Sequence, residues 1–381
     1  MSATLLREDW RPLAPFTVRE ACASDNEGLI ALAESCSMSG DIELRIDRRP
    51  DFFTLNELEG EWRLAVAERE GKIVGCICFS EREAHLDGVP QTTGYVGDLK
   101  VHPDHRDMAV ADALSRYAKE RMISLGEEAA VLITVLAGNA AMQRRLHGPR
   151  GLPSFSHVAT VRTHSLSILW KRRERRAHNA DGVAIRPATW ADVEEMADLW
   201  STVAPARQLS PVHDAESLAR WIRDAPGLDI TSYRLAHGAN GRLLGFFGLW
   251  DQREFKQMSV VSYSSRMAVA RSVLNAITPI VGAERLPGAG RELNLVTALN
   301  VCVPPARPDV LRSLIVAAHN ELRHSSCSLL NIGLDTTDPL SPALDGLFAQ
   351  PTDVNAYLCN GNGKAWNRPF AGPLHYEIAL V

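Results

Sequence analysis

The sequence has no long apolar run and no strong excess of charge of one sign. Its 381 residues carry 41 Lys and Arg against 46 Asp and Glu, a formal net charge of −5. No run is long enough to span a bilayer, and the first residues lack the apolar core of a signal peptide, so we expect a cytoplasmic protein with no membrane partner. The slightly acidic balance argues against nucleic acid as a partner.

Cysteine is scarce and scattered, at positions 22, 36, 76, 78, 302, 327 and 359. No pair has the Cys-x-x-Cys or Cys/His spacing of a zinc site, so no metal is predicted. On a strand, Cys76 and Cys78 would share one face. Buried, reduced thiols are the expected state of these residues. The Gly-x-Ser-x-Gly pattern of a nucleophilic serine is also absent.

Two segments of the chain are alike. Three residues of the first segment recur 167 positions later in the second: Arg19, Ala21 and Asp25 correspond to Arg186, Ala188 and Asp192. Each segment begins with a capping-box pattern, Ser24 to Glu27 in the first and Thr189 to Asp192 in the second. An apolar hairpin with a glycine-containing turn follows, at residues 63–75 and 234–245.

A further strand, helix and strand are then predicted in each copy. They span residues 94–101, 111–125 and 129–136, and again 292–301, 310–323 and 328–334. This order predicts an α/β (α+β) fold of two tandem domains, 1–170 and 183–381, each a mixed, mainly antiparallel sheet flanked by helices. The basic and polar segment 171–182 is interpreted as a solvated linker rather than a nucleic-acid patch.

The most informative stretch is residues 98–114, where a strand leads through a loop into a helix. The loop contains Arg106-x-x-Ala109-x-Ala111, with small residues where a bulky side chain would block access to the backbone. Unpaired N–H groups and the dipole at a helix N-terminus together favour an anion. The loop therefore predicts a phosphate-binding site.

This stretch resembles the pyrophosphate loop of the GNAT superfamily, the acyl-CoA-dependent N-acyltransferases. The family pattern is V-x-P-x-x-R-x-x-G-x-G/A, and Val101, Pro103, Arg106 and Ala111 are in register. Ala109 departs from the pattern, because the family usually has glycine there. The order of elements resembles a tandem pair of GNAT domains over most of the chain.

The resemblance implies that acetyl-CoA or another acyl-CoA binds the first half, with residues 95–101 and 131–136 as the fourth and fifth strands. A bulge near Leu99 and Lys100 would separate these strands and leave a notch for the thioester. The implied cofactor-binding residues are Leu99, Lys100, Val101, Arg106, Asp107, Met108, Ala109, Val110, Ala111 and Asn139.

Catalytic groups are less clear from the sequence. Asp98 is a candidate base for the acceptor amine, or else a strand residue that pairs with Lys100. Glu81, Glu83, His85 and His102 are further candidates for the base. The usual tyrosine of the family is replaced by Leu146, and the adjacent His147 is a candidate acid or an ordinary surface histidine.

The corresponding loop of the second half contains Pro304, Pro305 and Pro308, which remove N–H donors. The first half is therefore predicted to be the active one. Residues 37–61 would line the acceptor site, and are interpreted as a solvated helix with Phe52 or Phe53 in the core. Trp200, Trp221 and Trp250 are interpreted as core residues.

The predicted function is N-acyl transfer, with acetyl as the expected group, to a primary amine of a small molecule or peptide. The amine would attack the acyl-CoA directly in a ternary complex. Two alternatives stay open at this point. One is a non-catalytic module that binds acyl-CoA, and the other is an acyltransferase whose donor is a carrier protein or an aminoacyl-tRNA.

Overall fold

The computed structural model describes residues 16–106, 109–147, 152–172 and 182–380. The elements of the first half are β1 Thr17–Glu20, α1 Asn26–Ser35, β2 Ile42–Asp47, β3 Glu61–Arg69, β4 Lys72–Leu86, β5 Val89–Val101, α2 Val110–Ser124, β6 Ala130–Leu136, α3 Ala140–Arg145 and β7 Ser156–Ser167.

The elements of the second half are β8 Ala184–Pro187, α4 Val193–Val203, β9 Ser210–Pro211, α5 Ala215–Asp224, β10 Tyr233–His237, β11 Leu243–Trp250, β12 Gln257–Tyr263, α6 Ser265–Val281, β13 Leu295–Cys302, α7 Pro308–Leu322, β14 Leu329–Asp335 and β15 Ala349–Asn360. The predicted strands and helices around the two loops are confirmed, with ends shifted by a few residues.

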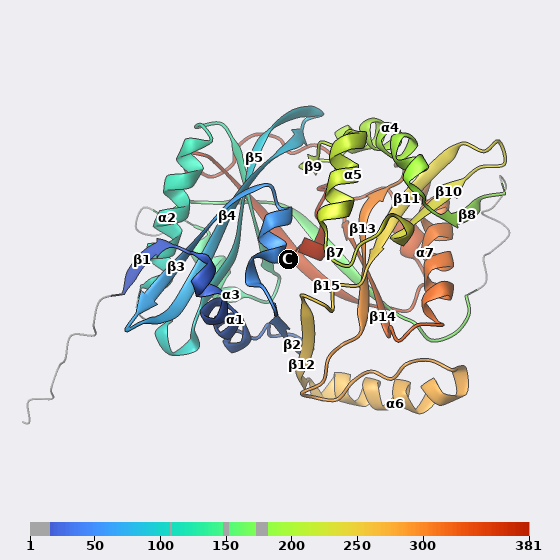
Figure 1. Cartoon of the computed structure of the whole chain (residues 1–381), viewed down its shortest axis with the longest axis horizontal. Coiled ribbons are helices and arrows are strands. Elements are labelled where there is room, and N and C mark those ends of the chain that lie inside the picture. Colours follow the sequence, from blue (N-terminus) through green and yellow to red (C-terminus); the bar gives the residue numbers. More distant parts are fainter. Residues whose placement is uncertain (1–15, 107–108, 148–151, 173–181, 381) are drawn as a thin grey trace, which may run out of the picture.

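One continuous sheet runs through both halves (Figure 1). Its strand order is β1, β3, β4, β5, β6, β15, β7, β14, β13, β11, β10, β8, and β9 pairs with β4. Only β5 with β6 and β13 with β14 are parallel, so the predicted mixed, mainly antiparallel α/β class is confirmed. Strands that precede the predicted linker and strands that follow it belong to this same sheet. Residues 173–181 of the linker lie outside the described residues.

The two halves exchange their last strands. β15, from the second half, pairs with β6, while β7, from the first half, pairs with β14. β7 and β15 then pair with each other along most of their length. The exchange brings the segment that follows β15 into contact with the first half.

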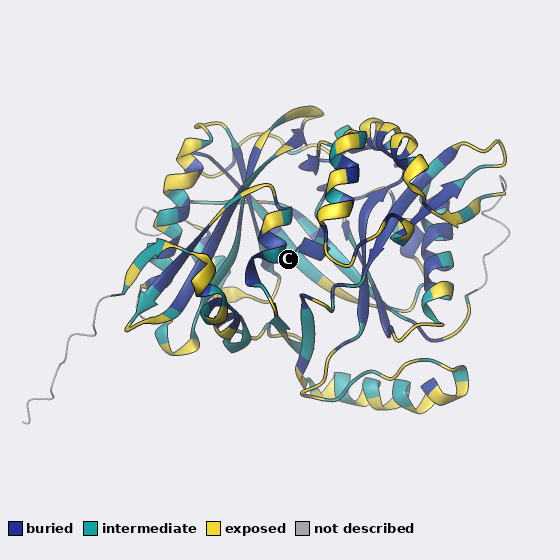
Figure 2. Cartoon of the chain, viewed as in Figure 1, coloured by how far each residue is buried: buried dark blue, intermediate teal, exposed yellow. Residues whose placement is uncertain are grey.

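Helices cover both faces of the sheet in each half. In the first half, α2 packs on one face, against Ala65, Ile77 and Val96. Helix α1 packs on the other face, against Cys76 and Cys78, which confirms their predicted shared face. Figure 2 shows the central strands as the most buried part of the molecule. Five of the seven free thiols are buried, whereas Cys36 is half-buried and Cys22 is exposed, contrary to the expectation for Cys22.

The internal correspondence extends to side-chain contacts. Arg19 donates two hydrogen bonds to Asp25, at 2.7 and 2.8 Å, and Arg186 donates the same pair to Asp192, at 2.9 and 2.6 Å. The predicted capping box from Thr189 to Asp192 is confirmed. In the first half the box joins Cys22 and Asp25 instead of Ser24 and Glu27, so that prediction was wrong.

Residues 37–61 do not form the predicted helix. They contain β2 and the 3-10 helix Phe52–Leu58, in which both Phe52 and Phe53 are buried. β2 pairs with β12 from the second half, so this wall of the first half is completed by the other half. Trp200 and Trp250 are fully buried, as predicted, and Trp221 packs against the same core.

Helix α6 lies apart from the large sheet, at the bottom of the view in Figure 1. Four large apolar side chains on it are solvent-exposed, namely Val269, Val273, Ile277 and Ile280. Neither α6 nor any other helix within the described ranges is long and apolar enough to cross a membrane.

We expect Gly75→Ala to destabilise the fold by about 1–3 kcal/mol, because overpacking forces neighbours to move. A Cβ atom at Gly75 would lie 2.8 Å from a methyl of Val110, 3.0 Å from a methyl of Leu114 and 3.0 Å from the carbonyl oxygen of Lys100. Gly138→Ala is the control, since nothing lies within 4 Å of its Cβ position. Urea unfolding of both variants tests this, and equal stability would contradict it.

Candidate active site

A notch opens where β5 and β6 diverge. The two strands pair only at Gly94, Tyr95 and Val96, opposite residues 131–133. Beyond Val96, β5 continues toward the loop that precedes α2, without pairing to β6. The family resemblance implied such a separation of the fourth and fifth strands.

A bulge in β5 lies beside this notch. Cys78 pairs with Gly97 while Cys76 pairs with Lys100, which leaves two residues of β5 opposite a single residue of β4. The bulge therefore comprises Asp98 and Leu99, one residue earlier than predicted. Asp98 has a φ of +51°, in the left-handed region that is costly for any residue except glycine.

The Asp98 carboxylate is held by two cations. Arg48 donates a hydrogen bond of 2.7 Å to Asp98 Oδ2, Lys100 donates to Oδ1, and Asn56 Nδ2 donates to Oδ2 at 3.3 Å. Burial alone would raise the pKa of this carboxyl, but Lys100 and Arg48 hold it well below its usual range. So weak a base does not take a proton from an amine near neutral pH. The geometry thus favours the alternative prediction, pairing with Lys100, over a role as the base.

Glu59 is a second buried carboxyl on the same face of the sheet. Ser80 Oγ donates a hydrogen bond of 3.0 Å to Glu59 Oε2. Burial raises the pKa of Glu59 to about 7, and the negative charge of Asp98 contributes to the shift. A carboxyl with a pKa near the working pH is suited to act as a general base.

The chain can place Glu59 there because a glycine follows it. Gly60 has a φ of +105°, and a Cβ atom at this position would lie 2.3 Å from the carbonyl oxygen of Glu81 on β4. Any other residue would push the turn away from the strand.

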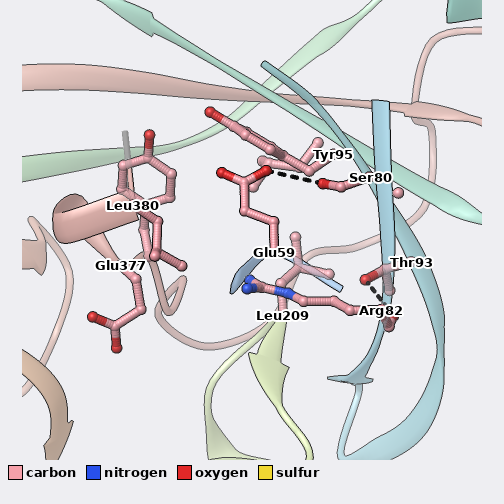
Figure 3. A pocket seen from close by; sticks show the side chains of 11 residues that line it. Glu59, Ser80, Arg82, Thr93, Tyr95, Leu209, Glu377 and Leu380 are labelled. Atoms are coloured by element: carbon pink, nitrogen blue, oxygen red, sulfur yellow. Dashed lines mark hydrogen bonds between the residues drawn. The ribbon is translucent and has the colours of Figure 1, made fainter. Parts of the chain in front are cut away.

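Glu59 lines a pocket at the base of the notch, built from both halves of the chain (Figure 3). Strands β4, β5 and β6 contribute from the first half, and the segments around Leu209 and Glu377 contribute from the second half. The lining residues are Glu59, Ser80, Arg82, Thr93, Gly94, Tyr95, Leu132, Leu209, Tyr376, Glu377 and Leu380. Glu81, Glu83, His85 and His102, the other candidate bases, are not among them.

Three hydroxyl groups bridge the strands where they diverge. The Tyr95 hydroxyl lies 3.0 Å from Thr134 Oγ1, which lies 2.8 Å from the Tyr376 hydroxyl. Burial raises the pKa of Tyr376 to about 12. These phenols are therefore protonated at neutral pH and can donate a proton or a hydrogen bond into the notch.

The rejected candidates have structural partners instead. His85 is buried and its Nδ1 lies 3.2 Å from the carbonyl oxygen of Ser210, a contact between the halves. The Glu83 carboxylate accepts a hydrogen bond from Thr92. His102 Nδ1 accepts one from the N–H of Asp104, at 3.3 Å.

The predicted phosphate loop ends at Ala109, the residue before α2, which has a φ of +56°. This conformation explains why the family pattern has glycine there. Arg106 is exposed, with Nε 3.5 Å from the Val101 carbonyl oxygen. Val110 is buried under the sheet, whereas Ala111 is half-buried in the first turn of α2.

The remaining predicted residues are placed as follows. The side chains of Leu99 and Val101 pack toward α2. The Asn139 side chain accepts a hydrogen bond of 3.0 Å from the N–H of Met142 and so caps α3. His147 is exposed and is not among the pocket residues. Asp107 and Met108 lie outside the described residues.

The second half repeats the bulge but fills its notch. Phe246 pairs with Cys302 and Gly248 with Leu299, so the bulge lies at Asn300, whose φ is +47°. The Asn300 N–H donates a hydrogen bond of 2.9 Å to the carboxylate of Glu377. The backbone N–H at this bulge is thus already bonded to the Glu377 side chain of the same chain.

The loop that follows this second bulge leaves little room for a ligand. Helix α7 begins at Pro308, and Val303, Val310 and Leu311 are all buried. A Cβ atom at Gly245 would meet Val303 and Val310. Gly75 and Val110 pack in the same way in the first half, so the assignment of acyl-CoA to the first half stays a prediction that rests on the prolines of the second loop.

Comparison with known proteins identifies the fold. The Acetyltransferase (GNAT) family pattern matches residues 22–147, which include the notch, the bulge and the loop. This match makes the first half of the chain similar to the GNAT acyltransferases. Within the described part of the chain, no group of three or more His, Cys, Asp or Glu side chains is placed to hold a metal ion.

Three similar proteins cover most of the chain. Acetyl transferase GW6a of Oryza sativa subsp. japonica is 24% identical, over 80% of this chain and 70% of that protein. N-myristoyltransferase of Saccharomyces cerevisiae with bound myristoyl-CoA superposes with a TM-score of 0.61 at 15% identity, over 93% of this chain and 81% of that chain. A GCN5-related glucosamine N-acetyltransferase region of a fungal multi-domain β-N-acetylglucosaminidase has a TM-score of 0.60 at 15% identity, over 91% of this chain and 38% of that chain.

Sequence reasoning missed Glu59, Tyr95 and Tyr376. The only local signal for Glu59 is an acidic residue between Leu58 and Gly60 at the end of an apolar segment. The two tyrosines meet through the exchange of strands, which no local pattern reveals.

We expect Ala109→Gly to stabilise the protein, on the order of 0.5–1 kcal/mol, because alanine in the left-handed region costs more than the extra freedom of glycine when unfolded. Urea unfolding measures the change. Ala113→Gly, in the first turns of α2, is the control and should destabilise. A loss of stability in Ala109→Gly would show that residue 109 does not adopt the left-handed conformation.

Proposed function

We propose that this protein transfers an acyl group, with acetyl as the expected group, from acyl-CoA to a primary amine at the notch of its first half. The observation that carries the proposal is a buried carboxyl, Glu59, with a pKa raised to about 7, in a pocket lined by the strands that carry the notch. The charge of Asp98, in the bulge of β5, contributes to this shift, so the bulge lies near the proposed base.

Acyl-CoA fits the first half at two places. Arg106 is exposed beside the N-terminus of α2, where a pyrophosphate would find positive charge and backbone N–H groups. The unpaired part of β5 beyond Val96 leaves a strand edge for the pantetheine arm. The similar yeast N-myristoyltransferase was solved with myristoyl-CoA bound.

The second half supports the role of the bulge. Its Asn300 N–H binds a carboxylate oxygen of Glu377, which shows that a backbone N–H at this position can bind a negatively charged oxygen. Asp98 is the residue at the same position of the first half, with a similar φ. We assign its N–H to the thioester carbonyl oxygen, where it would stabilise the charge that develops during attack.

Glu59 then accepts the proton of the acceptor ammonium, and the neutral amine attacks the thioester carbon. A C–N bond forms, the C–S bond breaks, and CoA leaves as a thiolate. A hydroxyl of the Tyr95, Thr134 and Tyr376 group can protonate this thiolate, in place of the tyrosine that the family has at the position of Leu146. The same hydroxyl group then recovers a proton from the attacking nitrogen, which still carries one proton more than the amide product. No covalent intermediate on the protein is required.

We expect Arg106→Ala to weaken the binding of acetyl-CoA about tenfold, because a charge-assisted contact to phosphate is lost. Arg307→Ala is the matched control and should bind normally, since Arg307 pairs with Asp309 in the filled half. Isothermal titration should give one site per chain. Equal weakening in both variants would contradict the assignment of the first half.

We expect Glu59→Gln to lower kcat/KM for the amine by roughly 10²–10⁴-fold, the usual contribution of a general base. For the unmodified protein, kcat/KM should rise with pH through about 7, as Glu59 ionises, and then level off. The rise should be absent in Glu59→Gln. Glu83→Gln, outside the pocket, should behave as the unmodified protein.

Stability separates this effect from misfolding. Because the pKa of Glu59 is raised in the folded chain, its contribution to stability is retained at acidic pH and lost as the pH rises through about 7. Glu59→Gln should therefore be at least as stable as the unmodified protein at pH 8. A variant that is stable and fully active would rule out Glu59 as the base.

A further inference from the structure

Arg82 is a cation of the pocket that the proposed mechanism does not use. It lies on β4, two residues beyond Ser80 on the same face, and lines the pocket with Glu59. Figure 3 shows its guanidinium next to Glu59. Within the described residues, no side chain or carbonyl group forms a hydrogen bond or ion pair with this guanidinium.

The other cations near the pocket have partners. Arg48 and Lys100 share the carboxylate of Asp98. The buried Lys256, from the second half, donates a hydrogen bond of 3.1 Å to the carbonyl oxygen of Ala379. The half-buried Arg82 thus differs from these neighbours in that its guanidinium lines the pocket with no partner among the described residues.

Charged side chains of both signs lie around the pocket. Arg82, Glu59 and Glu377 line it, and the charges of Arg48, Lys100 and Asp98 lie close by. Burial lowers the pKa of Lys256 to about 7, and the charges of Arg48 and Lys100 lower it as well. The Glu377 carboxylate accepts a hydrogen bond of 2.9 Å from the Asn300 N–H, whereas the Arg82 guanidinium has no such partner among the described residues.

We propose that the acceptor carries a carboxylate close to its amine, as an amino acid does, and that Arg82 binds this carboxylate while Glu59 receives the amine proton. The proposal rests on the function proposed above and adds a substrate class to it. A planar guanidinium matches a carboxylate with two parallel hydrogen bonds, which would fix the amine beside the base.

Arg82 also favours the reactive form of such an acceptor. Its positive charge beside the bound ammonium group disfavours the charged amine, so the ammonium group loses its proton more readily. Glu59 lines the same pocket and can take that proton. The carboxylate of the acceptor, in contrast, is stabilised by Arg82.

The test uses pairs of acceptors that differ only in the carboxylate, such as phenylalanine with phenethylamine and leucine with isoamylamine. Release of CoA from acetyl-CoA by the full chain gives kcat/KM for each member. We expect the amino acid to be preferred by at least tenfold in the pair that is turned over. Arg82→Gln should raise KM for the amino acid about 10- to 100-fold with little change in kcat, and should raise KM for the plain amine much less.

Two variants complete the design. Arg82→Lys should retain part of the preference, because the charge stays while the paired hydrogen bonds are lost. Arg63→Gln, an exposed arginine on β3, should change nothing. Equal rates for both members of a pair, or equal losses for both in Arg82→Gln, would overturn the role of Arg82 and leave the proposed function intact. If neither the amino acids nor the plain amines cause release of CoA, both the proposed function and the role of Arg82 are overturned.

Discussion

The antiparallel pairing of β7 with β15 is the constraint on which the rest of the structure depends. It joins the two halves into one sheet and places a strand from the end of the chain directly beside β6. The segment that follows β15 then reaches the pocket, where Tyr376 and Leu380 line one wall. Since these contacts link residues more than 200 positions apart, the first half cannot complete its own site. The acceptor pocket is a product of the whole chain.

The same backbone device is used twice with different outcomes. Asp98 and Asn300 both adopt a left-handed conformation within a strand, which costs roughly 1–3 kcal/mol each. Each is anchored by its side chain: Asp98 by Arg48 and Lys100, and Asn300 by the Tyr233 hydroxyl, at 2.7 Å. In the second half the carboxylate of Glu377 occupies the N–H of the bulge. In the described part of the first half no side chain does so, which is consistent with the proposal that this N–H binds the thioester carbonyl.

Local patterns predicted the features that depend on neighbouring residues. The Arg19 and Asp25 pair, its copy at Arg186, the strand-loop-helix around Ala109 and the bulge all lie within short windows of sequence. A prediction was wrong where two overlapping capping-box patterns were possible at the start of the same helix. The capping box uses Cys22 and Asp25 rather than Ser24 and Glu27, and there Arg19 holds the Asp25 carboxylate beside the start of the helix.

Features that depend on distant contacts were not predictable in this way. Residues 42–47 pair with β12 from the second half, and only this distant partner makes them part of the wall of the site. The strand itself was predictable, because Ile42, Leu44 and Ile46 alternate with charged residues. The exchange of β7 and β15 does not change the alternation of apolar and polar residues along these strands. Each strand would bury the same face whether it paired within its own half or with the other half. Glu59 becomes a candidate base only when residues from the end of the chain cover it.

The two carboxyls near the pocket have opposite pKa shifts. Asp98 and Glu59 lie on one face of the same sheet, yet their pKa values shift in opposite directions. Two cations in direct contact keep the half-buried Asp98 charged, whereas Glu59 accepts a hydrogen bond from the Ser80 hydroxyl and its pKa is raised by burial. Pairs of titratable groups driven apart in this way are typical of sites that move protons. The fixed charge of Asp98 also raises the pKa of Glu59, so the residue that anchors the bulge adjusts the carboxyl proposed as the base.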